Sequence, residues 1–300
     1  MRVGIIGAGF SGKVIAGRFL EGGIPVWGTT RTDDKAANLA DSGLTPVIFD
    51  GINATPTLLD ALAETTHLVI SIAPPREADS SGNSSLTDPT LRALQELSMK
   101  DSAPNLQWAG YLSTVGVYGN HDGAWVTEET EVAPVSERSL QRVRAEADWL
   151  TFREGTGIPV GIFRLSGIYG PGRNALRTAE QGKARRLIKK DQVFNRIHVT
   201  DIAQALFLAA HNAADGVFNI TDDEPAPPQD VVTYAHQLLG MEPPQELDFE
   251  TADLTPMARS FYGENKRVSN AKSKDVLGMI YQFPSYRVAL DGLFRNENWR

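Results

Sequence analysis

Three glycines near the start of the chain, at positions 7, 9 and 12, have a spacing that can serve phosphate binding. They follow the apolar run Val3 to Ile6 and precede an amphipathic helical pattern from about Phe10 to Glu21. In such a turn the first glycine permits a tight bend, the second lets a pyrophosphate approach the backbone, and the third lets the helix lie close to the strand. The first N–H groups of the helix then point at the phosphates. A turn that merely needs glycine remains the alternative. We predict that the residues of this turn bind a dinucleotide, namely Gly7, Ala8, Gly9, Phe10, Ser11 and Gly12.

The end of the next expected strand, residues 25–29, indicates which dinucleotide binds. A unit that prefers NAD usually places Asp or Glu here to bond the ribose 2′-OH. This chain has Thr30 at that place and Arg31 after it, while the nearest acids are Asp33 and Asp34. A guanidinium can hold a 2′-phosphate through two charge-assisted hydrogen bonds. We therefore predict NADP(H) in preference to NAD(H), bound by Thr30 and Arg31, the alternative being that Arg31 is a solvated loop residue.

The composition limits the classes of protein and of site that remain. With 300 residues and 41% hydrophobic residues the chain can build a large core, and a net charge of −8 argues against nucleic acid as the main partner. There are no cysteines, which excludes disulfides, a thiol nucleophile and a Cys-based zinc site. The histidines show no metal-ligand spacing, so we expect no metal site. Because we see neither a signal peptide nor a run long enough to span a membrane, we expect a cytoplasmic protein.

Short apolar runs alternate with helical patterns through the first half of the chain. Runs of this kind separated by helices are typical of a parallel sheet that is covered on both faces. The sequence therefore predicts an α/β fold with a doubly wound parallel sheet of the Rossmann type. The expected strands are 3–6, 25–29, 45–49, 67–73, 106–114, 159–165 and 216–221, and the expected helices are 10–21, 33–41, 57–63, 87–100, 136–153, 202–211 and 230–239.

The pattern loosens after about residue 170, which suggests two parts. We expect a dinucleotide-binding domain over residues 1–169, with its sheet completed by about 199–221. Residues 170–198 and 222–300 are expected to form a smaller α+β lobe that binds the substrate. Ligands of such folds sit beyond the carboxyl ends of the strands. The strand ends therefore add these cofactor contacts: Asp50, Ala73, Pro74, Ser113 and Leu165.

Five segments in this order resemble the extended short-chain dehydrogenase/reductase superfamily, in its NAD(P)-dependent epimerase/dehydratase group. They are Gly7–Gly12, Leu112–Gly119, Arg164–Gly172, Arg196–Asp201 and Phe218–Ile220. The residues of several of these segments look most similar to those of the atypical, YeeZ-like branch. The resemblance implies that the Ser or Thr four residues before the Tyr of the "VYG" segment bonds the reacting carbonyl. That position is Thr114, with Ser113 beside it.

The active-site helix departs from the superfamily's pattern, which carries Tyr-x-x-x-Lys followed four residues later by Glu. Counted back from Glu146, the Lys position holds Arg142 and the Tyr position holds Arg138. The usual chemistry needs a phenol whose pKa a neighbouring ammonium lowers. Arginine cannot exchange a proton near neutral pH, since its pKa exceeds about 12. Arg142 can still bind the nicotinamide ribose, because that role needs only a cation and donors.

Other groups can be weighed as substitutes for the missing phenol. Tyr118 and Tyr169 follow strand ends that face the expected cleft, although an aromatic there is more often packed, with its hydroxyl bonded. His198 is expected to brace the lobe junction and Asp201 to cap the helix that follows. Glu128 lies in an acidic loop whose simplest reading is a solvated turn, and we keep it as a possible substrate contact. A basic cluster that reads as a solvated helix face could also meet an anionic substrate: Lys183, Arg185, Arg186, Lys189 and Lys190.

Two function classes follow. In the first, the protein is an NADP(H)-dependent oxidoreductase or epimerase/dehydratase-type enzyme that moves hydride to or from a small-molecule carbonyl or alcohol, with catalytic residues among Thr114, Tyr118, Tyr169 and Arg142. In the second, it binds NADP(H) without turnover, as a sensor or scaffold. The resemblance also implies a possible homodimer through the long helix near 136–153. Small molecules, rather than nucleic acid or membrane, are the expected partners.

Overall fold

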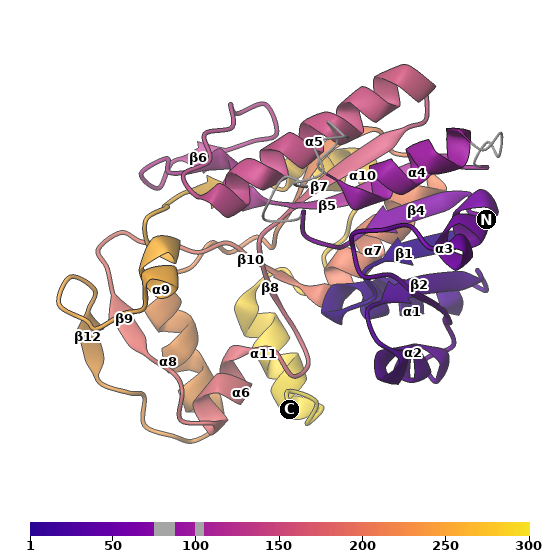
Figure 1. Ribbon diagram of the computed structural model, residues 1–300. Coiled ribbons are helices and arrows are strands. Elements are labelled where there is room, and N and C mark those ends of the chain that lie inside the picture. The colour runs from indigo at the N-terminus through magenta and orange to yellow at the C-terminus, as the bar shows by residue number, and fades with distance from the viewer. Residues whose placement is uncertain (75–87, 100–104) are drawn as a thin grey trace.

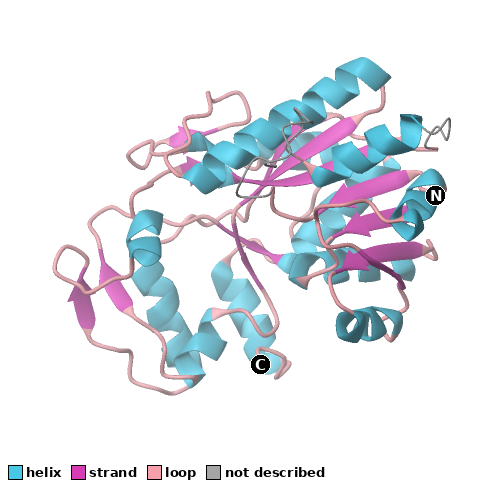
Figure 2. Cartoon of the chain, viewed as in Figure 1, coloured by secondary structure: helices cyan, strands magenta, loops and turns pink. Residues whose placement is uncertain are grey.

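A seven-stranded parallel sheet forms the centre of the computed structural model, which describes residues 1–74, 88–99 and 105–300. Its strands follow the order β11-β7-β5-β4-β1-β2-β3, and helices lie on both sides of them (Figures 1 and 2). This confirms the predicted α/β fold of the Rossmann type. In chain order the strands are β1 (Val3–Ile6), β2 (Val26–Thr30), β3 (Thr45–Ile48), β4 (His67–Ile70), β5 (Trp108–Thr114), β7 (Val160–Leu165) and β11 (Gly216–Ile220).

The two faces of the sheet carry separate hydrophobic clusters. One cluster packs α1 (Phe10–Glu21) and α7 (Val199–His211) on the sheet, and helix α2 (Asp33–Ala40) adds Leu39 to it. The other cluster packs α3 (Pro56–Ala63), α4 (Pro89–Met99) and α5 (Glu137–Thr156) on the opposite face. Because β1, β4 and β7 are buried along their whole lengths, they read as continuous apolar runs rather than as alternating ones.

Most predicted elements exist and differ from the prediction by a few residues at their ends. The clearest difference is β4, which ends at Ile70 instead of residue 73, so that Ser71 to Pro74 form a loop at the edge of the sheet. The predicted helix 87–100 appears as α4, and its expected N-cap, Thr87, lies outside the described residues. No helix in the described part of the chain is long and apolar enough to cross a membrane.

A smaller group of elements lies beside the sheet, at the lower left of Figure 1. It contains α6 (Ala175–Glu180), α8 (Pro228–Leu238), α9 (Pro256–Phe261) and α11 (Tyr286–Arg295), with β9 (Arg186–Ile188) paired to β12 (Glu246–Asp248). Its own hydrophobic cluster joins α6, α8 and α11 through Leu176, Ala235 and Leu290. Two short parallel pairs connect distant segments: β8 (Gly167–Tyr169) with β10 (Arg196–His198), and β6 (Trp125–Val126) with β13 (Arg267–Val268).

Part of the C-terminal region returns to the large core. Helix α10 (Ala271–Leu277) lies against β11 and α7, and Leu277, Met279 and Tyr281 join the cluster beneath α1. We expected 222–300 to belong mostly to the smaller lobe, but Leu277, Met279 and Tyr281 pack in the core of the large sheet. This segment is surrounded by prolines and polar loops, and it contains few apolar residues. Its composition therefore resembles that of its neighbours in sequence and does not indicate a contact with the large core.

Candidate functional site

The glycine turn between β1 and α1 has the three features expected of a phosphate cradle. Gly7 has φ +91°, which side-chain-bearing residues rarely adopt. A Cβ on Gly12 would lie 2.5 Å from the carbonyl oxygen of Gly7, so only glycine lets the helix approach the strand this closely. By contrast, no atom of the described residues other than its chain neighbours lies within 4 Å of a Cβ built on Gly9, which leaves that position open. An open middle glycine at the start of a helix fits the diphosphate of a dinucleotide.

The end of β2 is fastened to this turn. The hydroxyl of Thr29 accepts a hydrogen bond from the N–H of Gly7 (2.7 Å), and its carbonyl accepts one from Ala8 (2.9 Å). Thr30 is half-buried and Arg31 is exposed directly beyond the strand. No hydrogen bond or ion pair joins Arg31 to another of the described residues. The guanidinium is therefore at the predicted place with its donors available.

The other predicted cofactor contacts lie at the ends of neighbouring strands. Asp50 is exposed after β3, and its Oδ1 accepts the N–H groups of Ile52 (2.7 Å) and Asn53 (3.1 Å), so one carboxylate oxygen already orders its own turn. Ala73 is exposed and Pro74 is buried in the loop after β4. Leu165 ends β7 and belongs to the core cluster beneath α1. Whether these residues touch a cofactor stays a prediction.

Arg142, at the position of the superfamily's lysine, is anchored to the carboxyl ends of two strands. Its Nη1 donates to the carbonyl oxygen of Leu112 (2.6 Å) and lies 3.2 Å from the Tyr111 hydroxyl and 3.4 Å from the Ile72 carbonyl oxygen. These bonds hold the guanidinium at the edge where ligands of this fold bind. Its Nε and Nη2 make no hydrogen bond with the described residues. Arg138, one helical turn earlier, is exposed.

Thr114 and Ser113 end β5 with different environments. The Thr114 hydroxyl oxygen accepts the N–H of Gly116 (3.1 Å) and so caps the short helix η1 (Val115–Tyr118). Its own proton remains available to donate. The Ser113 hydroxyl is buried and donates to a carboxylate oxygen of Glu146. Of the two hydroxyls, that of Thr114 therefore keeps a proton that no described residue accepts, and its contact with a substrate carbonyl stays a prediction.

A buried polar network, which the sequence did not predict, supports this strand end. Glu146 and Arg164 pair through Oε2 and Nη2 at 2.8 Å, with side chains only 6% and 8% exposed. The Arg164 guanidinium carbon lies 4.8 Å from the centre of the Tyr118 ring, and the Tyr118 hydroxyl donates to Asn219 Oδ1 at 2.7 Å. The available signal was a charged residue, Arg164, inside an otherwise apolar strand.

This network changes the interpretation of two predicted site residues. Tyr118 exposes none of its surface, and burial raises the pKa of its hydroxyl. It therefore does not face the cleft, contrary to our expectation, because its ring packs in a buried cluster with Val126 and Val268 and its hydroxyl is bonded to Asn219. Glu128 is not merely a solvated turn residue, since its Oε1 accepts the backbone N–H of Asn219 (2.7 Å) on the edge strand β11.

The segment after β7 brings Tyr169 and His198 together. Their rings meet edge to face at 5.4 Å, as their strands β8 and β10 pair in register. The Tyr169 hydroxyl is buried without a partner among the described residues, and its pKa is raised, first by burial and then by the Asp222 carboxylate. The prediction that Asp201 caps α7 is wrong: its carboxylate accepts the N–H groups of Gln282 and Phe283, and His198 is the cap residue.

The predicted basic cluster is mostly paired. It lies on β9 and the adjoining loops, so the expected helix face is wrong. Arg186 pairs with Glu246, Arg185 donates to the Asp253 carbonyl oxygen, and Lys189 donates to the Tyr262 carbonyl oxygen.

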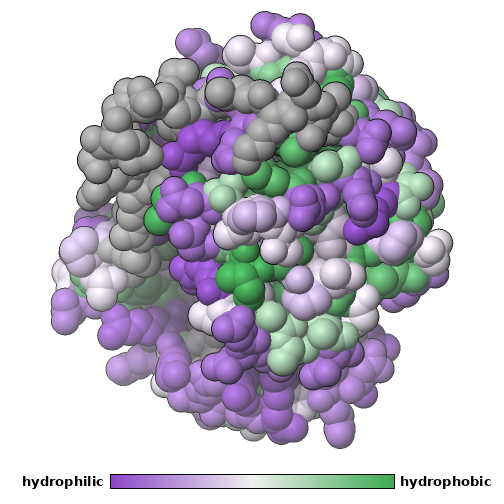
Figure 3. Space-filling view, turned by 45° about the vertical axis from the view of Figure 1, so that its right-hand side comes forward, coloured by the Kyte–Doolittle hydropathy of each residue, from purple (hydrophilic) through white to green (hydrophobic). Residues whose placement is uncertain are grey.

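On the face shown in Figure 3, hydrophobic patches lie among polar side chains. Among the residues that the structure describes, no cluster of His, Cys, Asp or Glu could hold a metal ion.

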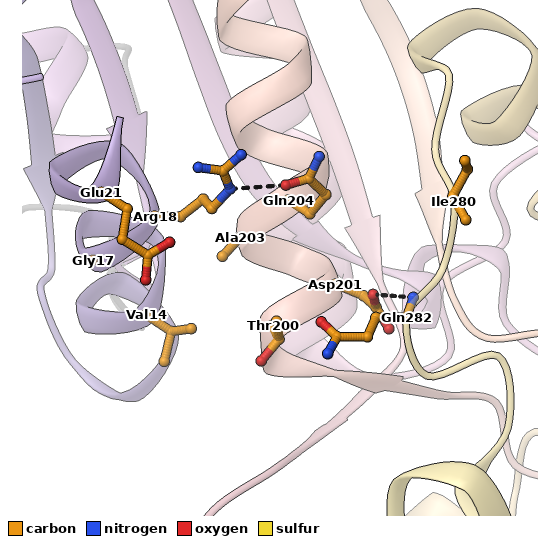
Figure 4. Close-up of a pocket in the computed structure, with 10 residues that line it drawn as sticks. All are labelled: Val14, Gly17, Arg18, Glu21, Thr200, Asp201, Ala203, Gln204, Ile280 and Gln282. Atoms are coloured by element: carbon orange, nitrogen blue, oxygen red, sulfur yellow. Dashed lines mark hydrogen bonds between the residues drawn. The ribbon is translucent and has the colours of Figure 1, made fainter. Parts of the chain in front are cut away.

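A cavity of about 580 Å³ lies away from the glycine turn, between α1 and α7 (Figure 4). Its walls include Val14, Ala203 and Ile280, and an Arg18–Gln204 hydrogen bond of 2.9 Å crosses it. It contains none of the residues of the strand ends that we predicted as cofactor contacts. This cavity is therefore separate from the glycine turn and from the strand ends that we predict to bind the nucleotide.

Comparisons with known proteins agree with the fold and identify the family. Residues 3–221 match the NAD dependent epimerase/dehydratase family. Protein YeeZ of Escherichia coli K12 is 29% identical over 94% of this chain and 96% of its own length. A conserved protein of unknown function from Silicibacter pomeroyi has a solved structure with 42% identity, 99% coverage of both chains and a TM-score of 0.84. UDP-glucuronic acid 4-epimerase from Bacillus cereus, solved with NAD, has 17% identity, 98% and 96% coverage, and a TM-score of 0.75.

Proposed function

Because the chain belongs to the NAD dependent epimerase/dehydratase family, we propose that it is an NADP(H)-dependent enzyme of this family. It transfers hydride between the nicotinamide and a carbonyl or alcohol of a small molecule. The single observation that carries the proposal is the open cradle at Gly9 with the unpaired Arg31 beyond the neighbouring strand. The cradle fits a diphosphate, and the guanidinium fits a 2′-phosphate.

The residues present fit the cofactor and divide its binding among them. The first N–H groups of α1 would hold the diphosphate, Arg31 the 2′-phosphate, and Arg142 the ribose next to the nicotinamide. The bound nicotinamide supplies hydride chemistry that no side chain can supply. The protein's contribution is orientation, and Arg142 suits it because its Nη1 is fixed to Leu112 while its other nitrogens remain available.

Thr114 is the group proposed to polarise the substrate oxygen. Its Oγ1 already accepts the Gly116 N–H, so its hydroxyl proton is directed elsewhere. A hydroxyl that donates to a carbonyl oxygen stabilises the negative charge that develops there as hydride arrives. Neither Arg138 nor Arg142 gives up a proton near neutral pH, so this site would work by polarisation and positioning rather than through the usual phenol. Solvent water would supply the proton that converts the alkoxide into the alcohol, and would take it up in the reverse direction.

The cofactor assignment is tested by replacing Arg31. Arg31→Ala should weaken NADPH binding about tenfold and leave NADH binding unchanged, since charge-assisted hydrogen bonds to an exposed phosphate are worth about 1.5 kcal/mol. Lys35→Ala on the adjacent helix is the matched control, because it removes one exposed charge without changing the strand end. Equal NADPH affinity in wild type and Arg31→Ala would overturn the preference for NADP(H).

Catalysis is tested by following NADPH absorbance over a panel of aldehydes, ketones and nucleotide sugars. With any substrate found, Thr114→Val should lower kcat strongly while NADPH affinity is retained, and Thr114→Ser should keep most of the activity because it keeps both the hydroxyl and the cap. If Thr114→Val turns over as fast as Thr114→Ser, the hydroxyl has no part in the reaction.

A second candidate function has its own observation in its favour. Arginine stands at both positions of the superfamily's acid/base pair, and the nearby Tyr118 is buried and bonded. A protein with this arrangement can bind NADP(H) without turnover, as a sensor or scaffold. Tight NADPH binding with no oxidation by any member of the panel would favour this function over the enzyme.

A further inference from the structure

The turn between β8 and α6 is held in one geometry. The backbones of Gly170 and Arg173 exchange two hydrogen bonds, of 2.9 and 3.0 Å. Asn174 closes the turn, because its Nδ2 donates to the carbonyl oxygens of Gly170 and Trp299, both at 2.8 Å. The turn therefore lies next to the C-terminus (Figure 1) and fixes the start of the Arg173 side chain.

This turn lies on the first residue of α1. The Arg173 guanidinium carbon is 5.7 Å from the centre of the Phe10 ring. A Cβ built on Gly170 would lie 3.6 Å from Phe10 Cζ, so the backbone at Gly170 lies against the tip of the Phe10 ring. Phe10 directly follows the open Gly9, so a cation from a distant part of the chain lies beside the side chain of the residue that begins α1.

The charge of Arg173 has no counter-ion in the described residues. The neighbouring arginines differ, since Arg177 and Arg300 both pair with Glu180 at 2.8 Å. The start of a helix carries a partial positive charge, and a second cation beside it is unfavourable unless an anion lies between them. The position of Arg173 thus favours an anionic ligand.

His198 adds an independent, buried donor at the same place. It is 3% exposed, its Nδ1 accepts the N–H of Thr200 (3.3 Å), and Phe283 packs on its ring at 3.9 Å. Burial lowers the pKa of His198 to about 4, so the ring is neutral at pH 7 and carries its proton on Nε2. That Nε2 has no acceptor among the described residues and would lie 3.5 Å from a Cβ on Gly170. An unpaired buried donor of this kind is unfavourable, and an acceptor from a ligand would satisfy it.

We propose that Arg173 and His198 complete the site for the diphosphate of the dinucleotide at the start of α1. The Arg173 guanidinium contributes charge and the His198 Nε2–H contributes a neutral hydrogen bond, in addition to the helix N–H groups. This inference rests on the proposed cofactor function and deepens it. It assigns binding of the diphosphate itself to residues outside the β1–α1–β2 unit, so that the segment following β7 contacts the bound dinucleotide.

The test compares three ligands that carry different phosphates. NADPH has the diphosphate and the 2′-phosphate, ADP has only a diphosphate, and 2′-AMP has only the 2′-phosphate. Titrated into Arg173→Ala, NADPH and ADP should bind about tenfold more weakly than to wild type, while 2′-AMP binds equally. Arg177→Ala is the matched control for loss of one positive charge and should bind all three ligands as wild type does. His198→Phe, which keeps a ring against Phe283, should weaken ADP binding by a smaller factor, with melting curves to confirm that it is folded.

The outcomes separate this inference from the proposed function. If wild type binds NADPH and Arg173→Ala binds NADPH and ADP with the same affinity as wild type, the inference is overturned and the cofactor function stands. If Arg173→Ala weakens the binding of 2′-AMP as much as that of ADP, Arg173 acts only through the long-range attraction of its positive charge, and the assignment to the diphosphate is wrong. If wild type binds no dinucleotide, both the function and the inference are overturned.

Discussion

Replacing Glu146 by glutamine tests the buried network that supports the end of β5. The Glu146–Arg164 pair is closed at 2.8 Å with both side chains less than one-tenth exposed, and Ser113 donates to the same carboxylate. Removing one partner of such a pair leaves the other charge buried without compensation. We expect Glu146→Gln to lower the free energy of unfolding by about 3–5 kcal/mol, measured by urea denaturation.

A double variant separates the effect of an uncompensated buried charge from the effect of changing the side chain at this position. In Glu146→Leu/Arg164→Met both charges are gone and similar volumes remain, so the loss relative to wild type should be under about 2 kcal/mol. The exposed pair Arg2–Glu64 gives the control, since its side chains are 43% and 63% exposed and Glu64→Gln should cost less than about 1 kcal/mol. The reasoning is refuted if Glu146→Gln is no less stable than Glu64→Gln, or if the double variant is as unstable as the single one.

Two further predictions concern buried hydroxyl and carboxyl groups. Tyr118→Phe removes the hydrogen bond to Asn219 and should lower the free energy of unfolding by about 1 kcal/mol. The affinity for NADPH, measured by fluorescence titration, should stay unchanged. A loss of NADPH affinity would show that Tyr118 belongs to the binding site. Burial raises the pKa of Asp222 from 3.8 to about 8, so the folded protein keeps a proton that the unfolded chain releases between these values. The stability of wild type should therefore fall as the pH rises from about 4 to about 8. Asp222→Asn should show a flatter profile of melting temperature over that range, and parallel profiles would contradict this origin.

The apolar runs and the glycine spacing in the sequence predicted the sheet and the tight turn between β1 and α1. The apolar runs of β1, β4, β5 and β7 identify buried parallel strands because both faces of each are covered. The glycine spacing identifies the turn because backbone conformation and close approach restrict those positions to glycine. These constraints are local in sequence, so they can be recognised before any tertiary contact is known.

The rest depends on contacts between distant segments that leave little local pattern. Whether Tyr118 faces the cleft depends on η1 and on Asn219, which lies about a hundred residues later in the chain. Asp201 looks like a helix cap by position, yet its carboxylate bonds the backbone of Gln282 and Phe283. The pairs β8–β10 and β6–β13 contain only two or three residues each, which is too short for an alternating pattern to show.

A crystal structure of the wild-type protein with NADPH tests the central claim most directly. The account predicts that the diphosphate lies at the start of α1 beside Gly9, with the 2′-phosphate bonded by Arg31 and the nicotinamide ribose bonded by Arg142. NADPH bound elsewhere, for example in the cavity between α1 and α7, or a glycine turn still empty at a saturating concentration of NADPH, would contradict it.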